Sequence, residues 1–115
     1  FLDNSLAEAH IAMAYVQFVK YKDYEAGKNS LAKAVELAPY NPTARLHYGW
    51  ELLQRGDLAG AYPQIVLAQE YAPLSAHNNL TLCSVLMFKR DYESALKFCQ
   101  KSLELQPTTS LVNIQ

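Results

Sequence analysis

A repeat of 34 residues runs through the 115-residue sequence and constrains its fold more than any other feature. Several columns of similar residues recur at this interval, all in the same phase. They are Pro39, Pro73 and Pro107; Asp23, Asp57 and Asp91; Glu36, Glu70 and Glu104; Gly27, Ala61 and Ala95; Ala34, Ala68 and Ser102; Leu31, Ile65 and Cys99; and Leu37, Tyr71 and Leu105. Chance does not place so many columns in one phase, so the chain is an array of repeats.

Each repeat has the hydrophobic pattern of two amphipathic helices joined by a short turn. One helical face of the middle repeat consists of residues spaced by four, three and three positions, namely Ala61, Ile65, Ala68 and Tyr71. Before it, Gly56 can adopt the backbone conformation found at helix ends, and Asp57 can cap the next helix by accepting its free amide hydrogens. Pro73 ends that helix because proline has no amide hydrogen.

Capping residues also mark where helices start. Ser5 and Glu8 have the spacing of a capping box, and Asn41 stands before Pro42, a residue suited to the first helical turn. We therefore expect helices near residues 6–20, 24–38, 42–55, 58–72, 76–89 and 92–106. Pro63 departs from the pattern, because it lies beyond the first turn if Asp57 is the cap. The helix there is expected either to begin late or to kink near Gly60.

The repeat resembles the tetratricopeptide repeat, whose pattern is W-x2-L-G-x2-Y, then A-x3-F, then P over 34 residues. The second repeat reads Arg45-x2-Tyr48-Gly49-x2-Leu52, Ala61-x3-Ile65 and Pro73, and the third reads Asn79-x2-Leu82-Cys83-x2-Leu86, Ala95-x3-Cys99 and Pro107. The first repeat matches in its second half, at Gly27-x3-Leu31 and Pro39. Its first half fits only when shifted by one residue, as His10-x2-Met13-Ala14, which predicts one extra residue around Val19 to Lys22.

This resemblance implies an all-α fold, a right-handed superhelix (α-solenoid) of three helix pairs with a partial C-terminal capping helix. It implies a single domain over residues 1–115, with repeats at about 7–39, 42–73 and 76–107. Residues 108–115 would begin a capping helix or a further repeat. Because the chain starts with Phe1 rather than Met, we expect it to be a fragment or a processed product.

The sequence offers little chemistry outside the repeats. Ten Lys and Arg against 11 Asp and Glu remove the electrostatic attraction expected for nucleic acid or an anionic membrane, and no apolar run approaches a membrane span. His10, His47 and His77 lack the spacing of a metal site, and no known nucleophile, phosphate-loop or zinc-protease motif occurs. Cys83 and Cys99 fall at packing positions, where we expect buried small hydrophobes, with a disulfide only if their geometry permits it. We expect no enzyme activity and no catalytic, cofactor-binding or metal-binding residue.

In tetratricopeptide repeat proteins the first helices of the stacked pairs line a groove that takes up partners, and the resemblance implies the same here. The protein-binding residues that it implies are Leu46, His47, Trp50, Leu53, His77, Leu80, Thr81, Ser84 and Met87. The first repeat adds either Ala12, Val16 and Val19 or, with the one-residue shift, Ile11 and Tyr15. Trp50 is then either a binding hot spot or a residue that packs against a neighbouring helix.

Some members of the family bind chaperones by gripping a C-terminal carboxylate with Lys, Asn and Arg at fixed groove positions. The matching positions here are Ala12, Val16, His47, His77 and Thr81, none of which is Lys or Arg. The resemblance therefore implies a groove for a hydrophobic or helical ligand, either a partner protein or peptide or a segment of the same protein.

Two stretches, Ala7–His10 and Ala68–Ser75, resemble repeats that follow winged-helix DNA-binding domains or nucleotide-cyclase domains in large bacterial regulators. The resemblance implies a cytoplasmic module for signalling or partner docking, part of a bacterial transcriptional regulator or a related protein, that binds neither nucleic acid nor membrane itself. The alternative is a structural module whose exposed end repeats drive the formation of a homo-oligomer.

Overall fold

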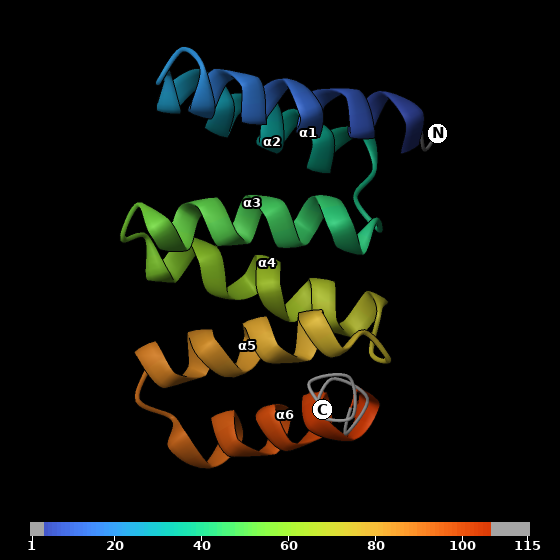
Figure 1. Ribbon diagram of the computed structural model, residues 1–115, viewed down its shortest axis with the longest axis vertical. Coiled ribbons are helices and arrows are strands. Elements are labelled where there is room, and N and C mark those ends of the chain that lie inside the picture. The colour runs from blue at the N-terminus through green and yellow to red at the C-terminus, as the bar shows by residue number, and fades with distance from the viewer. Residues whose placement is uncertain (1–3, 107–115) are drawn as a thin grey trace, which may run out of the picture.

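The computed structural model describes residues 4–106, which form three helix pairs stacked along the long axis of the molecule (Figure 1). The helices are α1 (Asn4–Val19), α2 (Tyr24–Leu37), α3 (Pro42–Gln54), α4 (Leu58–Tyr71), α5 (Ala76–Phe88) and α6 (Tyr92–Leu105). The expected helices agree with these bounds to within two residues. Over the described residues the fold is an all-α solenoid without a strand, as predicted. The expected capping helix at residues 108–115 lies outside the described residues.

The aspartate column caps the second helix of every pair. Asp57 Oδ1 accepts the Gly60 amide at 2.8 Å, as predicted. In α2, Asp23 Oδ1 accepts the Ala26 amide at 3.1 Å, and in α6, Asp91 Oδ1 accepts the Ser94 amide at 3.3 Å. Asn41 caps α3 as expected, by accepting the amides of the second and third residues of that helix. The aspartates that recur every 34 residues therefore mark the start of the second helix in each pair.

The turns inside the three pairs reverse the chain through a residue with positive φ. These residues are Lys22 (53°), Gly56 (84°) and Arg90 (65°), each directly before the capping aspartate. Only glycine takes this conformation without strain, as expected for Gly56. The first turn spans residues 20–23 and is one residue longer than the turns at 55–57 and 89–91, which confirms the predicted extra residue.

One local expectation was wrong, and one of two alternatives at another site is excluded. Helix α1 already begins at Asn4, so Ser5 lies inside the helix and does not cap it. Helix α4 does not begin late, the first alternative for Pro63, because Asp57 caps it at Leu58 and the helix continues through Pro63. The exposed Pro63 removes one backbone hydrogen bond, and the helix tolerates this loss because its buried face is held by packing.

Small residues let the two helices of a pair lie close together. A Cβ atom built on Gly27 of α2 would lie 2.5 Å from Cδ1 and 2.6 Å from Cζ of Phe18 in α1. One built on Gly49 of α3 would lie 2.7 Å from Cγ1 of Ile65 in α4. Ile65 belongs to the largest buried cluster, which joins the second and third pairs through Leu52, Ala61, Ile65, Leu82, Cys83, Val85, Leu86 and Ala95. The glycines are thus sites of close helix contact.

Cys83 and Cys99 form a disulfide between α5 and α6, with their Cα atoms 5.3 Å apart. Of the two alternatives that the sequence left open, the structure shows the disulfide and not two unbonded cysteines. The helices approach closely at the buried Ala95, which brings the two cysteines within bonding reach, and Cys99 is only partly buried.

Polar side chains hold the second pair to the third. Asn79 of α5 is fully buried and donates to the carbonyl oxygens of Pro73 (3.0 Å) and Ser75 (2.8 Å). Its own oxygen accepts from Gln69 of α4 at 3.2 Å. One period earlier, Arg45 of α3 likewise donates to the Pro39 carbonyl at 2.9 Å. The linkers between the pairs are therefore fixed by side chains of the following helix.

Candidate functional site

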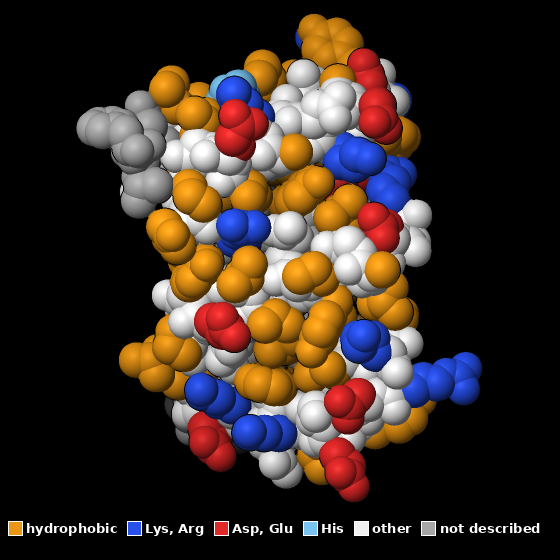
Figure 2. Space-filling view, turned by 180° about the vertical axis from the view of Figure 1, so that it is seen from behind, with side chains coloured by type: hydrophobic (Ala, Val, Ile, Leu, Met, Phe, Trp, Pro, Cys, Tyr) orange, Lys and Arg blue, Asp and Glu red, His pale blue; other side chains and the backbone are white. Residues whose placement is uncertain are grey.

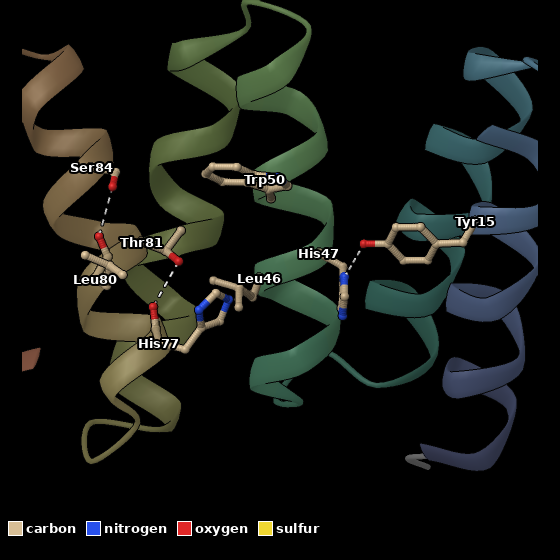
Figure 3. Close-up of a pocket in the computed structure, with 8 residues that line it drawn as sticks. All are labelled: Tyr15, Leu46, His47, Trp50, His77, Leu80, Thr81 and Ser84. Carbon is tan, nitrogen blue, oxygen red and sulfur yellow. Dashed lines mark hydrogen bonds between the residues drawn. The ribbon is translucent and has the colours of Figure 1, made fainter. Parts of the chain in front are cut away.

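A pocket of about 340 Å³ opens on the side of the molecule formed by the first helices of the three pairs (Figure 3). Helix α1 contributes Tyr15. Helix α3 contributes Leu46, His47 and Trp50, and α5 contributes His77, Leu80, Thr81 and Ser84. Helices α2, α4 and α6 contribute no residue to its lining.

Helical periodicity explains why these side chains meet. On α3, Ala44, Gly49 and Leu52 are buried in the stack, which turns Trp50 outward, and its side chain is 42% exposed. On α5 the lining residues follow the i, i+3, i+4, i+7 pattern, as His77, Leu80, Thr81 and Ser84, and so share one face of the helix. Leu80, on that face, is 48% exposed. The pocket thus has an apolar surface open to solvent.

Seven of the nine groove residues that the sequence indicated line this pocket. They are Leu46, His47, Trp50, His77, Leu80, Thr81 and Ser84. Leu53 instead packs against the buried cluster between the second and third pairs. Met87 lines a neighbouring pocket of about 330 Å³, which shares Ser84 with the first.

The sequence left two sets of pocket residues open for the first helix. The structure agrees with the set that assumes a shift of one residue. Tyr15 lines the pocket, while Ile11 packs against the buried clusters of the first pair. Val16 and Val19 are exposed outside the pocket lining. The longer first turn signals this register, since the extra residue displaces α1 by one position relative to the other repeats.

The hydroxyl groups in the pocket are already used in hydrogen bonds. Tyr15 Oη and His47 Nδ1 lie 2.5 Å apart, which links α1 to α3 (Figure 3). Thr81 donates to the His77 carbonyl at 2.9 Å, and Ser84 donates to the Leu80 carbonyl at 3.1 Å. Within residues 4–106 the Trp50 indole N–H and the His77 ring make no hydrogen bond, so they remain available to a ligand.

No Lys, Arg, Asp or Glu is among the residues that line the pocket. By contrast, the face shown in Figure 2 carries side chains of both charge signs among its apolar ones. Burial lowers the pKa of His47, and His77 lowers it further by charge repulsion. Burial raises the pKa of Tyr15, with a smaller contribution from Glu51, whose buried carboxylate pairs with Arg55 at 2.8 Å. Apart from the two histidines, the side chains that line the pocket are therefore uncharged at neutral pH.

The described part of the chain contains no group of three His, Cys, Asp or Glu residues placed to hold a metal ion. Among its helices, none combines the length and the apolar character needed to cross a membrane.

Comparisons with known proteins agree with the repeat pattern. Residues 77–109 match the sequence profile of the tetratricopeptide repeat. No curated protein matches the chain significantly. Among solved structures, the first tetratricopeptide repeat domain of Spaghetti (RPAP3), bound to the HSP90 peptide SRMEEVD, is similar with a TM-score of 0.82 at 19% identity, over 92% of this chain and 83% of that one.

Two further structures are similar over almost the same part of the chain. MamA gives a TM-score of 0.78 at 18% identity, over 94% of this chain and 63% of that one. YrrB is described as a tetratricopeptide repeat protein with an unusual peptide-binding site. It gives a TM-score of 0.75 at 25% identity, over 92% of this chain and 53% of that one. This chain thus spans less than two thirds of either protein. Residues 77–109 match the tetratricopeptide repeat profile, and residues 4–106 have the fold of these solved tetratricopeptide repeat structures.

Proposed function

We propose that the protein is a non-enzymatic interaction module that holds an apolar, uncharged segment of a partner protein in the pocket between α1, α3 and α5. The observation that carries the proposal is the open apolar pocket around Trp50 and Leu80, which no charged side chain lines. An exposed tryptophan in a concave apolar site is a common binding hot spot. The similar domain of RPAP3 and the similar protein YrrB support this proposal, since both are described with a bound peptide or a peptide-binding site.

The partner differs in chemistry from the peptide bound to RPAP3. The sequence SRMEEVD carries three acidic residues. The pocket of this chain offers no Lys or Arg to pair with them, since the lining positions that matter for a carboxylate clamp hold His47, His77 and Thr81. Burying an acidic segment without a partner charge is unfavourable, so an apolar segment fits better.

The wider setting is part of the same proposal. The repeats would span residues 7–39, 42–73 and 76–107, within a cytoplasmic bacterial regulatory or signalling protein whose other domains carry its output. The chain itself would not bind nucleic acid. The Cys83–Cys99 disulfide weighs against the cytoplasm, where thiols are kept reduced. Alkylating free thiols in intact cells tests the cytoplasmic location. If Cys83 and Cys99 escape alkylation because they are joined in a disulfide, the cytoplasmic location is contradicted.

Selection from a random peptide library displayed on phage tests the binding proposal directly. Peptides selected on the immobilised protein should be rich in apolar residues and poor in acidic ones. Trp50→Ala should weaken their binding at least tenfold with an unchanged circular dichroism spectrum. The matched control is Leu103→Ala, which truncates a 66% exposed residue on α6, outside the pocket. If Trp50→Ala and Leu103→Ala bind the peptides equally well, the proposal is wrong.

A second function, self-association, is favoured by the exposed face of α6. Leu96 and Leu103 on this helix are 58% and 66% exposed, and only Ala95 of α6 is buried. If this face pairs with another copy, sedimentation velocity should show an oligomer that Leu96→Ala and Leu103→Ala dissociate and Trp50→Ala leaves intact. Removing residues 108–115 should also change the association. A chain that is monomeric at all concentrations contradicts this function.

A further inference from the structure

Two histidines share the binding pocket. His47 lies on the side of α3 that faces Tyr15 of α1, and the His77 ring from α5 lies beside Leu46 (Figure 3). They are the only lining side chains whose charge changes between pH 5 and 8. The third histidine, His10, lies on α1 outside the pocket lining.

The groups around the two rings provide no counter-charge within the pocket. From α1 the facing titratable group is Tyr15, which is neutral in this pH range. On α3, the Glu51 carboxylate acts on Tyr15 and is paired with Arg55, but it does not line the pocket. Helix α5 adds only His77, and α2 and α4 contribute nothing to the lining. No side chain of the lining therefore carries a negative charge that could offset a proton taken up there.

The contact between Tyr15 and His47 also depends on protonation. When His47 is neutral with Nδ1 unprotonated, the tyrosine hydroxyl donates to that nitrogen. When both ring nitrogens carry protons, the hydroxyl has to turn and accept instead. A charged His47 therefore reverses its hydrogen bond with Tyr15 on the α1 side of the pocket. It also repels a charged His77.

On the basis of the proposed function, we infer that acid releases the partner: the groove binds an uncharged apolar segment while His47 and His77 are neutral and loses it when they are protonated. An apolar occupant removes water from both rings, which penalises their charged forms further. Binding therefore favours the deprotonated pocket, and affinity falls as the pH drops through the pKa values of the free protein. For each proton that must be released, linkage allows up to about a tenfold loss of affinity per pH unit.

The probe for this inference is a peptide selected on the protein at pH 7.5, with blocked termini and no ionisable side chain. Trp50 is the single tryptophan of the chain and lines the pocket, so its fluorescence follows binding. Between pH 7.5 and 5.5 the dissociation constant should rise about tenfold or more. Circular dichroism at each pH shows that the helices remain intact.

The variant His47→Gln/His77→Gln should bind the peptide with the same affinity at both pH values. His10→Gln, the matched control, should keep the full pH dependence. A second measurement follows the histidine ring protons by NMR, where adding the peptide should lower the pKa values of His47 and His77 but not that of His10. This readout needs only the pH range in which the protein is folded.

The outcomes separate this inference from the proposed function. If the library yields no peptide whose binding depends on Trp50, the proposed function fails. If such a peptide binds equally well at both pH values and leaves the pKa values of His47 and His77 unchanged, only the pH inference fails. A peptide with one added glutamate that binds more tightly at pH 5.5 than at 7.5, while the uncharged peptide does not weaken, would show an acidic partner instead and overturn the inference.

Discussion

Replacing Gly27 with alanine should destabilise the protein, although alanine is the better helix former. Gly27 lies within α2, and its added Cβ would overlap the Phe18 ring, 2.5 Å from Cδ1 and 2.6 Å from Cζ. The ring cannot easily move away. It is buried, lies edge-on to Tyr15 with centroids 5.9 Å apart, and stacks on Tyr24 at 6.2 Å.

The two opposing effects can be compared. In an unobstructed helix, glycine to alanine gains about 1 kcal/mol. Forcing an extra methyl group into a packed core costs roughly 1–3 kcal/mol, and a fixed aromatic ring puts Gly27 near the upper end. We expect a net loss of about 2 kcal/mol in the free energy of unfolding, which lowers the melting temperature by about 10 °C.

Urea unfolding followed by circular dichroism measures the loss. Asn29→Ala, on the exposed side of the same helix, is the matched control and should raise stability by a few tenths of a kcal/mol, roughly the difference in propensity. In a Phe18→Leu background the penalty of Gly27→Ala should fall by at least about 1 kcal/mol, because the smaller side chain leaves room. The packing argument is refuted if Gly27→Ala stabilises the protein as Asn29→Ala does.

Four further predictions rest on single features of the fold. Asn41→Ala removes an acceptor for two amide hydrogens at the start of α3 and should cost about 1 kcal/mol in urea unfolding, and an unchanged stability would contradict the capping role. Reducing the Cys83–Cys99 disulfide, whose partners are 16 positions apart, should cost about 3 kcal/mol, and a double serine variant should not respond to reductant. Gly56→Ala should cost about 1 kcal/mol through its φ of 84°, since no atom lies within 4 Å of the added Cβ. Gly49→Leu should cost roughly 1–3 kcal/mol by overpacking, and a melting temperature equal to that of the wild type would show that the second pair can spread.

The sequence predicted the helices well because the same signals occur three times. Asp57 was identified as a cap, and the period extends that role to Asp23 and Asp91. The extra residue of the first turn was visible because it shifts one repeat against the others. Local signals without such repetition were less reliable. Ser5 has the spacing of a capping box, yet α1 already begins at Asn4.

Contacts between helices were harder to predict than the helices themselves. Pro63 interrupts one hydrogen bond but not α4, because tertiary packing outweighs the loss. The disulfide depends on the distance between two helix backbones, which the spacing of Cys83 and Cys99 in the sequence does not determine. Leu53 lies three positions after Trp50, rotated by only about 60° around α3, yet it packs against the buried cluster, and the spacing in the sequence does not determine on which side of the pocket edge it falls.

The pocket lining and the contacts that stack the repeats are carried by different faces of the same helices. Asn79 and Gln69 fix the linker behind α5, whereas Leu80 and His77 lie on its open side. Trp50 is likewise solvent-exposed on α3, while Gly49 next to it is in close contact with α4. Exchanging the open side chains can therefore retune which sequences are recognised while the scaffold keeps its shape. A chain built this way can diverge in recognition much faster than in architecture.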